Sequence, residues 1–94
     1  MEYRISENKI ELLAEDGSTL AELDFPDYDR TGKTVEVVHT YVDERLRGQG
    51  VAGMLMEKLV RELRRTDRRA KLSCSYAMQW FERHREEGEL LSDE

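Results

Sequence analysis

The stretch Arg47-Gly48-Gln49-Gly50-Val51-Ala52 decides the fold of this chain. It follows an apolar run at residues 35–42 and opens an amphipathic segment at residues 49–65. Two glycines let the backbone approach a ligand closely, and the first turn of a helix presents unpaired N–H groups with a partial positive charge. A strand, a glycine turn and a helix start in this order are typical of a phosphate-binding site.

Residues 49–65 form the strongest helical pattern in the chain. Apolar residues recur there at spacings of three and four, which predicts a helix with one buried face: Ala52, Leu55, Met56, Leu59, Val60 and Leu63. The basic residues near its end, at positions 61–69, are expected to form a solvated face.

Three strands are predicted before this helix. Residues 9–14 and 19–25 pair through a hairpin, because Asp16-Gly17 is a strong turn signal, and the first strand is expected to continue one begun at residues 3–5. Residues 34–42 predict a third long strand, with Val35, Val37, His39 and Tyr41 on one face. Apolar residues on both of its faces favour a central position in the sheet.

Two further elements are predicted after the helix: a short strand at residues 70–74 and a second helix at residues 76–86. The tail at residues 88–94 is expected to fray. A strand–helix–strand unit favours a parallel crossover. The fold class is therefore a single α/β domain over residues 1–94, with a mixed sheet, an antiparallel N-terminal meander, a helix crossover to a short parallel strand, and a final helix.

Composition and charge restrict the classes of function. The 94 residues carry a net charge of −6, which argues against non-specific nucleic-acid binding, and no apolar run approaches the length of a membrane span. Residues 45–85 nevertheless hold 11 basic and 4 acidic groups, as a small polyanionic ligand would require. The only cysteine, Cys74, excludes an internal disulfide and, with no signal peptide, favours the cytoplasm.

The glycine turn fits two common nucleotide-binding patterns poorly. Residues 48–53 match G-x-G-x-x-G, but in dinucleotide-binding folds the first glycine follows the strand directly, and an acid about 20 positions later binds the ribose. Here residues 43–47 intervene, and the next strand ends without a carboxylate. A Walker-type loop is excluded, because no Gly-Lys-Ser/Thr follows.

A third pattern fits better. Arg47-x-x-Gly50-x-Ala52, after a strand and at a helix start, resembles the signature of the GNAT family of acetyl-CoA-dependent N-acetyltransferases. The segments 72–76, Leu-Ser-Cys-Ser-Tyr, and 80–84, Trp-Phe-Glu-Arg-His, are similar to a short single-domain subgroup in which a cysteine ends the strand and an Arg-His pair closes the helix. The resemblance covers roughly residues 8–91.

The resemblance implies acetyl-CoA as co-substrate. Its pyrophosphate would be held by the backbone amides of the turn: Arg47, Gly48, Gln49, Gly50, Val51 and Ala52. The main chain at Tyr41 and Val42 would pair with the pantetheine arm like an added strand, and strands 34–42 and 70–74 would splay apart to admit the thioester. The final strand pair of longer family members is not expected here, and Arg85 stands where the family usually has Pro or Gly.

Three side chains are candidates for the chemistry of acetyl transfer. Cys74, between a strand and a helix start, would carry the acetyl group, protonate the departing sulfur, or serve only as a small core residue. His39 is a candidate base, because imidazoles titrate near neutrality, or a structural histidine. Tyr76 would donate a proton to the sulfur or pack in the core.

Weaker candidates have more ordinary explanations. Glu36 is a second possible base, and Arg45 would contact phosphate or cap the loop. His84 shares a helix face with Trp80 and is expected to pack against it. An acidic group would attract a cationic amine or simply be solvated: Asp24, Asp27 and Asp29.

Together these features predict an N-acetyltransferase that moves acetyl from acetyl-CoA to a primary amine of a small molecule or peptide, without a metal, nucleic acid or membrane. The alternative is a non-catalytic module that binds CoA or acetyl-CoA and acts through a protein partner. The sequence names neither the acetyl acceptor nor the oligomeric state.

Overall fold

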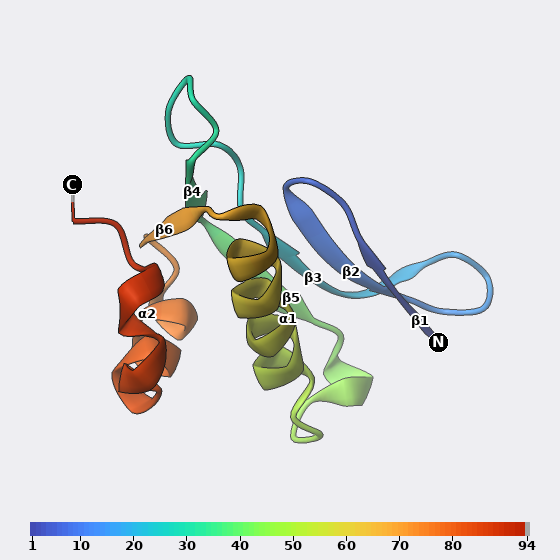
Figure 1. Ribbon diagram of the computed structural model, residues 1–94. Helices are drawn as coiled ribbons and strands as arrows, with labels where there is room; N and C mark the ends of the chain where they lie inside the picture. Colours follow the sequence, from blue (N-terminus) through green and yellow to red (C-terminus); the bar gives the residue numbers. More distant parts are fainter. Residues whose placement is uncertain (94) are drawn as a thin grey trace.

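The computed structural model describes residues 1–93 and shows strands and helices in the order that the sequence patterns predict (Figure 1). The elements are β1 (Glu2–Ile5), β2 (Lys9–Leu13), β3 (Thr19–Asp24), β4 (Thr34–Val37), β5 (His39–Val42), the 3-10 turn η1 (Glu44–Leu46), α1 (Val51–Thr66), β6 (Arg69–Leu72), α2 (Ser75–Arg83) and the 3-10 segment η2 (Arg85–Leu90). Within the described chain, no helix combines the length and the apolar character needed to cross a membrane.

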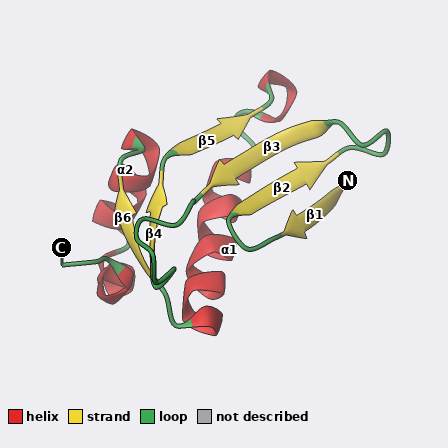
Figure 2. Cartoon of the chain, turned by 90° about the horizontal axis from the view of Figure 1, so that it is seen from above, coloured by secondary structure: helices red, strands yellow, loops and turns green. Residues whose placement is uncertain are grey.

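The strands form an antiparallel meander and a parallel pair, as predicted. β1, β2, β3 and β5 follow one another in a four-stranded antiparallel sheet, and β4 pairs in parallel with β6 across the α1 crossover (Figure 2). One boundary differs from the prediction. Residues 2–5 do not continue into β2 but fold back on it as a separate strand, with Tyr3 opposite Leu12, because the chain turns at residues 6–8.

The predicted long strand at residues 34–42 is broken at Val38. The carbonyl of Val37 accepts hydrogen bonds from the amides of Ser73 and Cys74, whereas the amide of Val38 donates to Asp24 in β3. Val38 and His39 therefore lie together opposite Asp24, which is the geometry of a β-bulge. The extra residue reverses the side-chain alternation, so Val35 and Val37 are buried while His39 and Tyr41 are exposed. Their predicted placement on one face is wrong for this reason.

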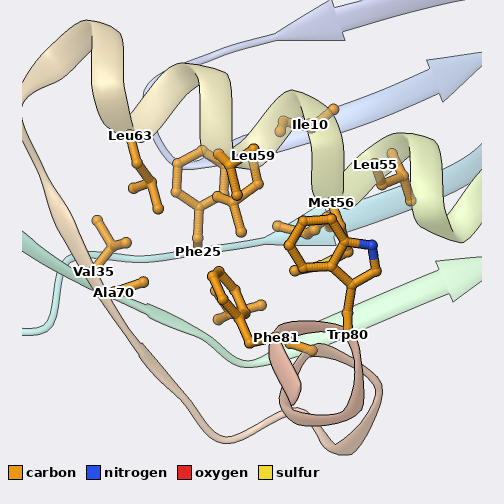
Figure 3. Close-up of a cluster of buried hydrophobic side chains, with 14 of the residues drawn as sticks. Ile10, Phe25, Val35, Leu55, Met56, Leu59, Leu63, Ala70, Trp80 and Phe81 are labelled. Carbon is orange, nitrogen blue, oxygen red and sulfur yellow. The ribbon is translucent and has the colours of Figure 1, made fainter. Parts of the chain in front are cut away.

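Helix α1 supplies the centre of the core (Figure 3). Its predicted apolar face is confirmed: Leu55, Met56, Leu59 and Leu63 are fully buried. They pack with Ile10 and Phe25 from the meander side and with Trp80 and Phe81 from α2 (Figure 3). The arrangement follows from the 3.6-residue period of the helix, which places every third or fourth residue on one side.

The tail is packed rather than frayed over its described part. The second helix ends at Arg83 and continues as η2, whose Leu90 is buried in the core. The next residues extend the parallel sheet, because Leu91 forms a bridge with Ala70 and the amide of Ser92 donates to the Ala70 carbonyl. Burial of the Leu90 side chain and pairing of the backbone hold this segment against the core. Glu94 lies outside the described residues.

Candidate active site

The glycine turn leads into α1 with backbone amides that have no acceptor among residues 1–93. Gly48 and Gly50 have φ values of 81° and 77°, a region that residues with a Cβ rarely adopt. The amides of Arg47 and Gln49 are used within the turn, where they donate to Glu44 and Leu46. Four other amides that were predicted to bind phosphate have no acceptor within residues 1–93, and the amide of Gly53 also has none. The five residues are Gly48, Gly50, Val51, Ala52 and Gly53.

The start of α1 has no other partner for these groups. Its N-cap is Gly50, which has no side chain to accept from the first turn, and that turn contains no acidic residue. Most helices satisfy some of these donors with a Ser, Thr, Asp or Asn cap. The exposed donors and the helix dipole together create an anion-binding position.

Strand β5 forms an open edge beside this turn. It pairs on one side with β3, and the amide of Asp43 donates to the Leu20 carbonyl at the end of the ladder. Antiparallel pairing alternates, so the backbone groups of Tyr41 point towards Glu22, while those of Thr40 and Val42 point to the free edge. An extended ligand could hydrogen-bond there as an added strand.

The free edge borders a gap that opens from Val37. At its closed end Val37 accepts from Ser73 at 3.1 Å and from Cys74 at 3.0 Å. Beyond this point β5 belongs to the antiparallel sheet and runs away from β6 and α2 (Figure 2). A pocket of about 180 Å³ lies at the wide end, lined among others by Val42, Arg47, Gly50, Ala52 and Tyr76. The structure therefore brings the predicted turn and the edge groups of Thr40 and Val42 to one opening, whereas the backbone of Tyr41, which was predicted to pair with the pantetheine arm, pairs with β3 instead.

Two of the three predicted catalytic side chains lie at this gap. Cys74 is half-buried at the N-cap of α2, and its Sγ lies 3.0 Å from Oγ1 of Thr40 in β5. Tyr76 lies beside the first turn of α1, where a β-carbon on Gly53 would be 3.8 Å from its hydroxyl oxygen. Burial raises the pKa of Tyr76 and outweighs the opposing charge of Arg83, so the phenol stays protonated and can donate.

Sequence reasoning missed Thr40. A threonine in a strand carries no functional signal of its own, and its partner Cys74 is 34 residues away. The two residues come into contact only in the folded chain. An apolar residue at position 40 would have fitted the strand pattern equally well.

The two histidines lie away from Cys74. His39 is exposed and pairs in register with Asp24, so its side chain occupies the sheet face opposite to that of Thr40. His84 stacks on Trp80 with a ring separation of 3.8 Å, and its Nδ1 lies 2.7 Å from the Trp80 carbonyl oxygen. The packing role predicted for His84 is confirmed.

The acidic residues near the loop have distinct roles. Asp27 accepts from the side chain of Asn8, and Asp29 accepts from Thr31, so both hold the loop together. Asp24 lies on the open sheet face, and its buried Oδ1 has no partner within residues 1–93. Burial and the neighbouring Asp24 raise the pKa of Glu22.

Arg45 is paired with Asp43 and does not face the turn. Its Nε and backbone amide both lie 2.9 Å from Asp43 Oδ1. These hydrogen bonds lower the pKa of Asp43 to about 2. Arg47 instead lines the pocket. Within the described residues, no three His, Cys, Asp or Glu side chains form a cluster suited to a metal ion.

Comparisons with known proteins agree with this geometry. The profile of the GCN5-related N-acetyl-transferase family matches residues 9–90. A GCN5-like protein from Staphylococcus aureus has 26% identity and a TM-score of 0.77, with 97% of this chain and 87% of that chain covered. A ribosomal-protein-alanine N-acetyltransferase from Brucella melitensis biovar Abortus 2308 shares the fold at 20% identity and a TM-score of 0.61, over 81% of this chain and 60% of its own. No protein of curated function matches in sequence.

Proposed function

The chain belongs to the GCN5-related N-acetyltransferase family, and from that premise we propose that it transfers an acetyl group from acetyl-CoA to a primary amine of a small molecule or peptide. The observation that carries the proposal is the set of five amides between Gly48 and Gly53, Gln49 excepted, that have no acceptor among the described residues and lie at the end of an open strand edge. Such donors suit a diphosphate, and a strand edge suits the two amides of a pantetheine arm.

In this proposal each part of the gap has one task. The free amides and Arg47 bind the pyrophosphate. The edge groups of Thr40 and Val42 pair with the pantetheine arm, which directs the thioester towards Cys74 at the closed end of the gap. An edge amide of β5 then lies near the thioester carbonyl and stabilises the negative charge that develops on its oxygen.

Cys74 and Tyr76 support two routes for the transfer. In the direct route the amine forms the new C–N bond as the C–S bond to CoA breaks, the nitrogen loses a proton, and the Tyr76 hydroxyl supplies one to the departing sulfur. In the second route the Cys74 thiolate first takes the acetyl group with release of CoA, and the amine then takes it from Cys74. His39 is proposed as the base for an amine that arrives from the open sheet face.

Binding is tested by isothermal calorimetry with acetyl-CoA and with acetyl-pantetheine, which lacks the pyrophosphate. We expect the shorter ligand to bind at least about tenfold more weakly, because it leaves the free amides unused. Equal affinities would show that the turn holds no diphosphate and would remove the basis of the proposal.

Chemistry is tested with a panel of small amines and peptides, by following release of CoA and the mass of each acceptor. Cys74→Ala should stop transfer if the thiol carries acetyl, and the intact mass of the wild type should then show one acetyl adduct. If acetyl is transferred at the wild-type rate by Cys74→Ala, the direct route operates. Tight binding with no transfer to any acceptor would favour the non-catalytic module. The single reduced cysteine is consistent with activity in the cytoplasm.

A further inference from the structure

We propose that Thr40 is the positioning residue for Cys74: its hydroxyl donates a hydrogen bond to the sulfur, stabilises the thiolate and holds it towards the gap. The inference rests on the proposed function, because it assigns a task to a group of that same site. It starts from the 3.0 Å separation between Thr40 Oγ1 and Cys74 Sγ, in which either atom could donate.

The backbone on both sides of this contact is fixed. Cys74 donates its amide to the Val37 carbonyl at 3.0 Å, and its own carbonyl accepts from Met78 at 3.1 Å as α2 begins. Thr40 lies within β5, in register with Leu23 of β3. Two anchored main chains therefore bring the side chains together, and the contact does not depend on a freely rotating loop.

The Thr40 hydroxyl has no competing partner within residues 1–93. Threonine often bonds to nearby backbone groups, yet here its oxygen is directed at the sulfur alone. A hydroxyl is a better donor than a thiol. Once the sulfur carries a negative charge it can only accept, so the direction of the bond is then fixed as O–H to sulfur.

The location of the sulfur adds to this effect. Cys74 occupies the N-cap of a nine-residue helix, where the amide groups of the first turn give a partial positive charge. Helix starts lower the pKa of cysteine thiols in general. A hydroxyl donor on the opposite side supplies a second, directional interaction, and hydrogen bonds to charged acceptors are stronger than neutral ones.

The phenol of Tyr76 lies at the same gap. Tyr76 is two residues along α2, and its ionisation and that of Cys74 oppose each other. Arg83 acts on Tyr76 with the opposite sign. A Tyr76→Phe background therefore separates the effect of Thr40 from that of the phenol.

The test measures the reactivity of Cys74, the only cysteine in the sequence. Alkylation by iodoacetamide is followed by intact mass in the wild type, Thr40→Val and Thr40→Ser, from about pH 6 to 10, where thiols titrate. Valine keeps the β-branched shape without the hydroxyl, and serine keeps the hydroxyl. We expect the alkylation rate of Thr40→Val near neutral pH to fall up to about tenfold, because valine removes the donor to the sulfur, with Thr40→Ser close to the wild type.

Two results would overturn the proposal: a Thr40→Val profile that coincides with the wild type, or equal losses of rate in the valine and serine variants. Thermal unfolding confirms that each variant is folded, and Thr40→Ala replaces the valine variant if that one fails to fold. The measurement involves neither acetyl-CoA nor an acceptor. Its outcome therefore stays separate from that of the transfer assay, which can fail while Thr40 still controls the thiol.

Discussion

The two ends of helix α1 differ in how their backbone groups are satisfied. Polar contacts cap its C-terminal end, whereas the amides at its N-terminal end have no side-chain cap within the described residues. At the C-terminal end Asp67 takes a left-handed conformation, and the amide of Arg68 donates back to Leu63 at 2.9 Å. At the other end Gly50 provides no side-chain cap, and five amides between Gly48 and Gly53 have no acceptor in the described part of the chain. The same helix thus has a hydrogen-bonded C-terminus and an N-terminus with amides that residues 1–93 leave unsatisfied.

The basic residues show the same contrast. Arg68 was expected on a solvated face, but it is nearly buried, donates to the Glu7 carbonyl at 2.9 Å and lies over the ring of Phe25. Arg64 pairs with Glu87 and Glu89 of η2. Two arginines near the end of α1 therefore contact other parts of the fold, although only Arg68 departs from the predicted solvated face, while Arg47 at the open end lines the pocket. We infer that stability is concentrated at one terminus and ligand binding at the other.

The largest expected effect concerns stability at the closed end. Leu90→Ala removes a side chain that is 6% exposed in the core beside α1, and should lower the free energy of unfolding by about 2 to 3 kcal/mol. Urea denaturation measures this loss, and exposed Met78→Ala is the control. Affinity for acetyl-CoA, measured well below the unfolding midpoint, should not change. A loss below about 0.5 kcal/mol would mean that the tail contributes no packing.

At the N-terminal end of α1, a negative charge should raise the stability of the fold and lower the affinity for acetyl-CoA. Ala52→Glu places a carboxylate in the first turn of α1, where it should stabilise the helix by about 0.3 to 1 kcal/mol. The same charge would oppose a diphosphate and weaken acetyl-CoA binding at least about tenfold.

Ala52→Gln is the matched control, since it has nearly the same size and no charge. Calorimetry gives the affinity and thermal unfolding gives the stability. Equal affinities for the Glu and Gln variants would show that no anion binds at this helix start, and the contrast between the two termini would then have no functional meaning.

The sequence was sufficient wherever local pattern decides structure. The period of α1, the Asp16-Gly17 turn and the glycines at positions 48 and 50 each express a short-range requirement, and each was placed correctly. The break at Val38 could not be predicted, because residues 34–42 fit a straight strand locally. The bulge arises from competition between two distant partners, Asp24 on one side and the start of α2 on the other.

The error in side-chain placement along this strand has the same origin. Once the bulge shifts the alternation, His39 moves to the open face and Thr40 to the gap, so a one-residue irregularity decides which side chain meets Cys74. In the tail, Leu90 and Leu91 were the available signal. An apolar pair inside an acidic segment indicates burial more strongly than the charge around it indicates disorder.

A pair of glycine substitutions compares the turn with the helix that follows. Gly53 has ordinary helical geometry, and a β-carbon there meets only the Tyr76 hydroxyl at 3.8 Å, so Gly53→Ala should stabilise the fold by about 0.5 to 1 kcal/mol. Gly48 has open space around it but a φ of 81°, so Gly48→Ala should destabilise by about 1 kcal/mol. Chemical denaturation of both variants checks the signs. Equal effects would mean that the turn is not held in its left-handed conformation.

The smallest effect concerns the charged side chain that anchors the segment before the turn. Hydrogen bonds from Arg45 lower the pKa of Asp43 to about 2, below the ordinary value of an aspartate. Because the folded-state pKa is depressed, the ionised carboxylate stabilises the fold above its ordinary pKa, and this contribution is lost as pH falls towards about 2. Asp43→Asn should therefore have a lower unfolding midpoint than the wild type near neutrality, and the difference should shrink on acidification. A difference that stays constant with pH would mean that the side chain acts through its shape as the cap of η1 and not through its charge. Since Asp43 is only half-buried and its partner Arg45 is exposed to solvent, added salt should also reduce the difference at neutral pH.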